Sequence, residues 1–170
     1  MPTEIQYGSN TVSWGYDVSP EEEPIRWFKL LLVQDTDLTP DLRTSTQIRR
    51  ARQLVREHYK TAVAVIADYL RLLWNHAIED ITRSRGESAV KGSTFQVWIT
   101  VPAIWQEDAC GRMREAAERA GITKRRTAGP TTLELVAEPE AAALAVLDDF
   151  KGRPDVQVSH RRRIIAAANS

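Results

Sequence analysis

The chain has 170 residues, a length that suits one domain or one lobe of a larger domain. Lys plus Arg and Asp plus Glu both number 23, so the net charge is zero and gives no electrostatic case for binding nucleic acid or an acidic membrane surface. The single cysteine, Cys110, excludes an intramolecular disulfide and reads as a small buried hydrophobe in a reducing compartment. No apolar run approaches the roughly 20 residues of a membrane span, and residues 1–10 lack a signal-peptide pattern. We therefore expect a soluble, cytoplasmic protein with neither nucleic acid nor membrane as partner.

The N-terminal part predicts a β-hairpin followed by an apolar segment. Residues 3–7 and 11–18 read as two short strands around the turn sequence Gly8-Ser9-Asn10. After a polar break, the segment IRWFKLLLV places Lys29 among apolar side chains. A lysine in such a run usually extends its ammonium group to solvent, so this pattern alone assigns no function.

A long amphipathic helix is predicted from about Thr44 to Thr82. Apolar residues recur there at three- and four-residue spacing, and no proline or glycine interrupts them, which indicates one helix or two helices in line. The bulky cluster in DYLRLLW, residues 68–74, favours a core-facing surface over a groove for a partner. Residues 83–93, which are basic and contain glycine and serine, predict a loop.

The segment from 95 to 147 predicts a strand, a helix, a second strand and a second helix. Apolar and polar residues alternate from 95 to 101, and Pro102 then removes the donor that would continue the strand. A helix is expected from about Gln106 to Gly121, and a buried strand from 133 to 137 leads directly into a helix that begins at Glu138. This order predicts a parallel β-α-β unit with a right-handed crossover.

Two motifs in this segment carry a family resemblance. TVPAIW, followed by a charged helix that ends in AAERAGI, and AEPEAAAL occur in a fitting order and at a fitting separation. Together they resemble the ATPase domain of the heat shock protein 70 family, in particular its divergent eukaryotic branch. The resemblance covers about residues 2–150. It implies an α/β fold class: an incomplete actin-like (ribonuclease H-like) ATPase lobe, with residues 1–150 as a partial first lobe and residues 151–170 as a divergent, disordered tail.

The resemblance implies roles for three residues. Glu138 matches the glutamate of an EPxAAA motif that, in the family, lies near metal-bound water and the attacking water. A carboxylate at the carboxyl end of a parallel strand suits that role, and a helix cap without a ligand is the alternative. Lys29, in RWFKLLL, resembles a family lysine that reaches the γ-phosphate. Both are candidate catalytic residues. We expect no metal ligand here, except for Glu138 acting through water.

Pro102 matches a proline that, in the family, relays the nucleotide state to a peptide-binding domain. The chaperones place an arginine eight residues after this proline. That position is Cys110 here, with Arg112 and Arg114 nearby, so the chain departs from the relay pattern.

The resemblance also implies ATP and Mg as cofactors, and unfolded peptides and co-chaperones as partners, of full-length family members. The family's two glycine-rich phosphate loops do not occur in this sequence. We therefore expect that the chain alone neither binds nor hydrolyses ATP, and that unpaired sheet edges favour self-association. The alternatives are a non-catalytic protein-interaction module and a fragment of a carbohydrate kinase of the same superfamily. AEPEAAAL resembles the form of this motif found in the chaperones, which argues against the carbohydrate kinase.

Overall fold

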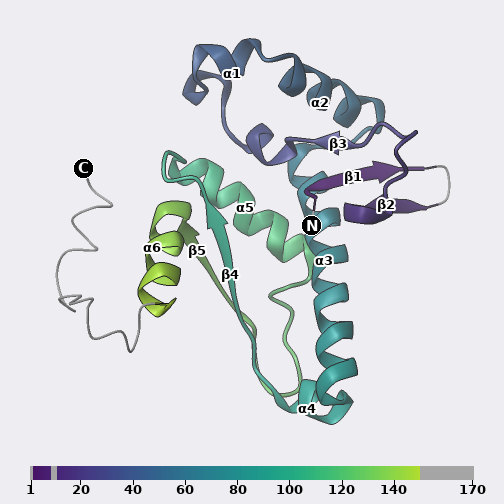
Figure 1. The fold of residues 1–170 in the computed structure, drawn as a ribbon, viewed down its shortest axis with the longest axis vertical. Coiled ribbons are helices and arrows are strands. Elements are labelled where there is room, and N and C mark those ends of the chain that lie inside the picture. The colour runs from purple at the N-terminus through teal and green to yellow at the C-terminus, as the bar shows by residue number, and fades with distance from the viewer. Residues whose placement is uncertain (1, 9–10, 150–170) are drawn as a thin grey trace.

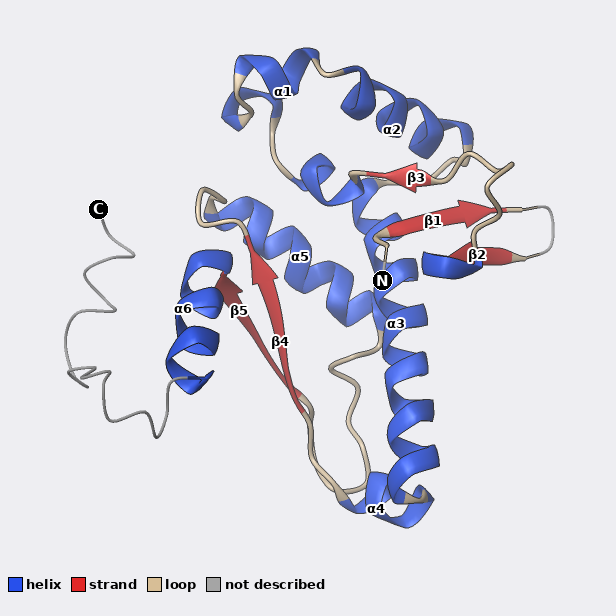
Figure 2. Ribbon diagram, viewed as in Figure 1, coloured by secondary structure: helices blue, strands red, loops and turns tan. Residues whose placement is uncertain are grey.

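The computed structural model describes residues 2–8 and 11–149, which form a mixed α/β chain with one antiparallel and one parallel sheet (Figures 1 and 2). The hairpin tip at Ser9 and Asn10 lies outside the described residues, and so does the tail predicted at 151–170. Within the described residues, no helix combines the length and the apolar character that crossing a membrane requires.

The predicted N-terminal hairpin is confirmed. Strand β1 (Glu4–Tyr7) pairs antiparallel with β2 (Val12–Trp14), and the short strand β3 (Ile25–Arg26) pairs antiparallel with the other edge of β1. The second strand is shorter than the predicted 11–18, because a 3₁₀ turn, η1 (Gly15–Asp17), begins at a glycine with φ 59°. After β3, the chain forms two further 3₁₀ turns, η2 (Phe28–Leu32) and η3 (Asp35–Asp37).

The predicted long helix is two helices, and they are not in line. After the short helix α1 (Pro40–Thr44) come α2 (Thr46–Glu57) and α3 (Ala62–Arg85), and Figure 1 shows α2 crossing above α3. The break lies at Tyr59, where φ is 52°. The Lys60 N–H donates to the Val55 carbonyl at 3.0 Å and the Tyr59 N–H to the Arg56 carbonyl at 2.9 Å, the bonding pattern of a helix end at which glycine is usual. Because the chain has tyrosine there, the sequence pattern did not indicate the end.

The loop predicted for residues 83–93 is wrong. Helix α3 continues to Arg85, Gly86 with φ 85° ends it, and a second short helix, α4 (Glu87–Gly92), follows. Helix α4 is stabilised by burial of Val90 and by an ion pair between Lys91 and Glu87 one turn apart. The apolar contact of a single valine was too weak a signal to outweigh the polar composition of this segment.

The predicted β-α-β unit is confirmed. Strand β4 (Gln96–Val101) pairs in parallel with β5 (Thr132–Ala137), and helix α5 (Glu107–Ala120) lies between them in the chain. The last register pair joins Val101 to Ala137, so both strands end at the same edge. Helix α5 ends at Gly121, which has φ 87°, and helix α6 (Glu138–Asp149) begins directly after β5.

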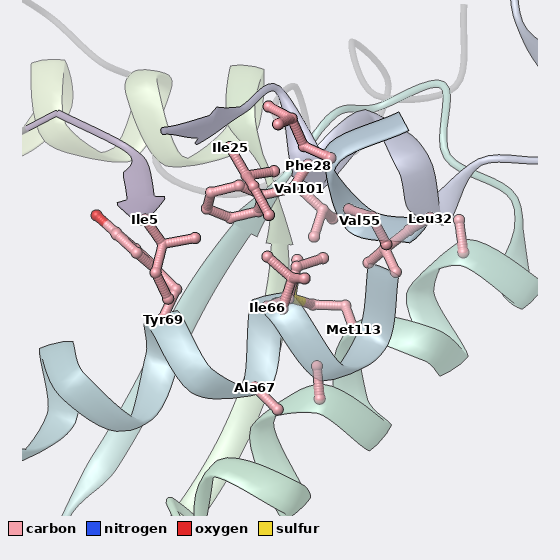
Figure 3. Packing of buried hydrophobic residues seen from close by; sticks show 14 of the residues in the cluster. Ile5, Ile25, Phe28, Leu32, Val55, Ile66, Ala67, Tyr69, Val101 and Met113 are labelled. Atoms are coloured by element: carbon pink, nitrogen blue, oxygen red, sulfur yellow. The ribbon is translucent and has the colours of Figure 1, made fainter. Parts of the chain in front are cut away.

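The main core lies where α3 packs against α5 and against the N-terminal sheet. Figure 3 shows side chains from β1, β3, η2, α3, β4 and α5 converging, among them Ile5, Phe28, Ile66 and Met113. Tyr69 is buried in this core, and Trp74 packs edge-on against Phe95 with ring centroids 5.5 Å apart. The cluster in DYLRLLW is therefore a core-facing surface, as predicted.

Candidate functional site

A pocket of about 500 Å³ brings together segments that are far apart in the sequence. The three predicted site residues, Lys29, Pro102 and Glu138, all line it. The remaining wall consists of residues 2–4 and of the chain from Arg26 to Leu30. The fold thus places the candidate catalytic pair and the candidate relay proline around one space, at the edge where β4 and β5 end.

Lys29 is held by the turn that carries it. Phe28 and Leu32 of η2 are buried, which anchors the turn and leaves Lys29 between them on the pocket side. Its ammonium group donates to Glu138 Oε1 at 2.7 Å and to the Thr100 carbonyl at 3.0 Å. The same group lies 5.7 Å from the centroid of the Trp105 ring. Lys29 is therefore bonded within the protein, and does not simply extend into solvent.

Glu138 is placed by the junction of a strand and a helix. Parallel pairing holds β5 in register with β4 as far as Ala137, and Glu138 is the first residue of α6. Its side chain is half exposed and its Oε1 accepts the hydrogen bond from Lys29. The carboxylate therefore carries an ion pair and still has a solvent-facing side on which it can bind a water molecule.

Pro102 ends β4 and begins a tight turn on the pocket wall. The Trp105 N–H donates to the Pro102 carbonyl at 3.1 Å, and this turn buries the Trp105 ring. Pro102 therefore connects the pocket to the start of α5.

A group of polar residues on α5 stabilises the end of η2. Arg112 donates to the Leu32 carbonyl at 2.7 Å and to Asp108 at 2.7 Å, and Gln34 donates to the same carboxylate at 2.7 Å. The hydrogen bond from Gln34, and after it the one from Arg112, hold the pKa of Asp108 below its usual value. Cys110, at the position where the chaperones have arginine, is half-buried and packs against the core. The sequence did not link Arg112 to the Lys29 turn, because the bond joins positions 80 residues apart.

Trp27 is the feature of this pocket that the sequence did not indicate. It precedes η2 with φ 60°, a left-handed conformation that is uncommon for a bulky residue, and its side chain is 57% exposed. An apolar run gives no sign of such a backbone conformation, which here turns the chain so that Lys29 faces the pocket.

The polar groups of the pocket fit part of a phosphate site. The Lys29 ammonium group can bind one anionic oxygen and the Glu138 carboxylate can orient a water molecule, while the second cation of the lining, Arg26, is paired with Glu4. Among the described residues, no three His, Cys, Asp or Glu side chains gather closely enough to hold a metal ion. A triphosphate with its Mg²⁺ needs more donors than this pocket supplies, so the described residues fit ATP and magnesium only in part.

Comparison with known proteins supplies two relatives. Heat shock 70 kDa protein 12B of Homo sapiens is 32% identical over 142 residues, which are 81% of this chain and 19% of that protein. Heat shock 70 kDa protein 12A of Mus musculus is 30% identical over 134 residues, 76% of this chain and 18% of that protein. The chain is thus similar to one part of the sequence of two heat shock 70 kDa proteins. The family resemblance read from TVPAIW and AEPEAAAL is thereby confirmed as a partial match.

The heat shock protein 70 match has clear bounds. The chain spans about a fifth of the length of these two curated relatives and aligns with one segment of each. No family model matches the chain, and no solved structure matches it.

Proposed function

We propose that the chain is a segment of the first lobe of an actin-like ATPase domain of the heat shock protein 70 type. The observation that supports this most is the contact between Lys29 Nζ and Glu138 Oε1, at 2.7 Å, at the carboxyl ends of two parallel strands. Such strand ends are where open α/β sheets bind their ligands. The two residues that the family resemblance singled out are 109 positions apart and nevertheless lie in one pocket.

In the complete protein, these residues would act on ATP and magnesium. The Lys29 ammonium would donate to a terminal phosphate oxygen, a charge-assisted bond of the stronger kind. Glu138 would release Lys29 and orient a water molecule, either one bound to magnesium or the one that attacks the phosphate. Pro102 lines the same pocket and starts the turn toward α5, which suits a relay out of the site. Cytoplasmic location, peptide clients and co-chaperones belong to this proposal through the family alone.

The chain by itself would bind ATP poorly. Its pocket is lined by two cationic groups, Lys29 and Arg26, each paired with a carboxylate of the protein, and hydrogen bonds to charged groups contribute about 1.5–3 kcal/mol each. Because each of these cations must give up its own carboxylate to bind a phosphate, the net gain stays within the roughly 4 kcal/mol that corresponds to millimolar binding. The segment would therefore require the phosphate loops of the rest of an ATPase domain.

Calorimetric titration of the 170-residue chain with MgATP tests whether the chain by itself binds ATP poorly. We expect no saturable binding below about 1 mM and no ATP hydrolysis. Micromolar binding that Glu138→Ala abolishes would contradict this expectation and would make the chain a nucleotide-binding unit in its own right.

The proposed roles of Lys29 and Glu138 in ATP hydrolysis are tested in a longer protein that contains this segment together with both phosphate loops. Lys29→Ala and Glu138→Ala should each lower kcat there by about 10²-fold or more, because each removes a group that acts on the reacting phosphate or its water. Arg83→Ala, an exposed change at the far end of α3, is the matched control and should leave kcat unchanged. Full activity in both pocket variants would refute the assignment.

A further inference from the structure

Helix α2 has a basic face that is separate from the pocket of Lys29 and Glu138. Its apolar residues, Ile48, Ala51, Leu54 and Val55, are buried against the rest of the protein. The opposite side is polar and forms a shallow groove of about 550 Å³, lined by Thr46, Arg49, Arg50, Arg52, Gln53 and Arg56. Figure 1 shows α2 at one end of the molecule, across the top of α3, with α6 on another side.

The two flanking arginines of this face are held from outside the helix. Arg50 donates two hydrogen bonds to the carboxylate of Glu23, at 2.6 and 2.5 Å, and Arg52 forms an ion pair with Asp35. These bonds fix the guanidinium groups along the edges of the groove. They also neutralise the positive charge of Arg50 and Arg52 at the two edges of the groove.

The two arginines that lie between Arg50 and Arg52 around the helix axis, Arg49 and Arg56, lack such partners. Arg49 and Arg56 are exposed, and within residues 2–8 and 11–149 neither forms an ion pair or a side-chain hydrogen bond. Seven residues, two helical turns, separate them, so they point the same way and lie roughly 10 Å apart along the helix. Arg52 stands three and four residues from them, but its ion pair with Asp35 neutralises it, so Arg49 and Arg56 carry the net positive charge of this face.

In helices α3, α4 and α5, basic residues form ion pairs within their own helix. Each carries a base next to an acid of its own helix, as in Arg71 with Asp68, Lys91 with Glu87, and Arg119 with Glu115. On α2 the one such contact is a long one, 3.6 Å between Arg50 and Glu57. Compared with α3, α4 and α5, helix α2 is therefore the one with two arginines on one face that lack an acidic partner among the described residues.

We propose that the outward face of α2 binds an acidic protein segment, with Arg49 and Arg56 as the principal contacts. Guanidinium groups bind carboxylates through paired, planar hydrogen bonds, and two of them about 10 Å apart select a segment whose carboxylates recur at that distance. Nucleic acid fits this face less well. The charge is confined to two turns of one helix, and carboxylates of Glu23, Asp35 and Glu57 border it. The described residues that line the groove include no aromatic side chain for a base to stack on.

Fluorescence anisotropy with a labelled octaglutamate peptide tests the proposal on the full 170-residue chain. At about 50 mM salt we expect saturable binding that weakens as salt is added. The variant with Arg49→Glu and Arg56→Glu should bind at least about tenfold more weakly, because each change replaces an attraction by a repulsion. The matched control reverses two exposed charges in the loop after α5, Lys124→Glu with Arg125→Glu, and should stay within about twofold of the unchanged chain.

Three results would overturn the proposal. The first is no saturable binding of the peptide by the unchanged chain. The second is an equal loss in the control variant, which would mean that the peptide senses net charge alone. The third is tighter binding of a single-stranded oligonucleotide of the same charge, lost in the α2 variant, which would assign the face to nucleic acid. Far-ultraviolet circular dichroism checks that both variants fold. If the variant with Arg49→Glu and Arg56→Glu does not fold, the milder pair Arg49→Gln and Arg56→Gln replaces it.

Discussion

The ammonium group of Lys29 lies 2.7 Å from Oε1 of Glu138 and joins a turn of the N-terminal half to the start of α6. The lysine side chain is 31% exposed and the glutamate side chain 50% exposed. Ion pairs with this degree of exposure contribute about 0–1 kcal/mol to stability, so stability alone accounts for little of this arrangement. Its consequence is positional, because the bond sets η2 against the end of β4 and closes one side of the pocket.

A double-mutant cycle measures this contact in solution. Lys29→Met and Glu138→Gln, alone and together, should give a coupling energy of about 0.2–1 kcal/mol in urea unfolding, reduced in 1 M salt because the pair is partly exposed. The Glu87–Lys91 pair of α4 is a reference, with an expected coupling of about 0.3–0.5 kcal/mol for an exposed pair one turn apart. A coupling of zero would contradict this expectation and would mean that the Lys29–Glu138 contact adds nothing to stability in solution.

Asp68 joins three elements, and its removal should destabilise the fold. Its carboxylate accepts hydrogen bonds from the Tyr7 hydroxyl at 2.9 Å, Lys60 at 2.8 Å and Arg71 at 2.9 Å. Asp68→Asn should lower the free energy of unfolding by about 1.5–3 kcal/mol, the range for bonds to a charged group, and Tyr7→Phe by less. Asp80→Asn, an exposed carboxylate on the same helix, should change it by less than about 0.5 kcal/mol. Equal effects at positions 68 and 80 would contradict the network.

The same network predicts a dependence of stability on pH. Burial raises the pKa of Asp68, but the hydrogen bonds from Lys60 and Tyr7 outweigh it and hold the pKa below its ordinary value of 3.8. Because the folded pKa is the lower one, this contribution to stability is fully present above about pH 4 and is lost as the pH falls through the folded value. Below pH 4, the unchanged protein should therefore lose stability more steeply than Asp68→Asn does. Parallel curves from urea unfolding at each pH would argue against it.

Tyr59 is a position where a glycine should stabilise the protein. Its φ of 52° is left-handed, which costs a residue with a side chain about 1–2 kcal/mol, and its side chain is 97% exposed, so little contact is lost. Tyr59→Gly should raise the free energy of unfolding by roughly 0.5–1 kcal/mol after the added freedom of glycine in the unfolded chain is subtracted. Tyr59→Ala retains the strained backbone and should bring no such gain. An equal gain in both variants would place the cause in the tyrosine side chain.

The parallel sheet has two strands, β4 and β5, and large apolar side chains remain exposed near it. Trp98, on the outer face of β4, is 55% exposed, and Ile104 is 70% exposed. We therefore expect the isolated chain to bind hydrophobic dyes and to self-associate as its concentration rises. Trp98→Thr should reduce dye fluorescence, whereas Tyr16→Thr, which removes an exposed aromatic ring from η1, should not. A monomer with a sharp cooperative melt and no dye binding would favour a self-sufficient interaction module.

The sequence by itself determined the elements whose signals are local. Alternation from 95 to 101 indicated β4, Gly121 marked the end of α5, and the order of strand, helix and strand predicted the parallel pairing of β4 with β5. The motif TVPAIW and the motif around Glu138 also indicated the family and named residues that line one pocket. Such signals are readable because each depends on side-chain spacing within about one element or on backbone preferences of single residues.

Tertiary structure alone decided what depends on packing between distant segments. Tyr59 ends α2 without a glycine, because burying one face each of α2 and α3 outweighs the cost of a left-handed tyrosine. Val90 supports a helix where composition indicated a loop. The contact of Lys29 with Glu138 and the bond of Arg112 to the Leu32 carbonyl join positions 109 and 80 residues apart, a separation at which no local pattern records which side chains meet.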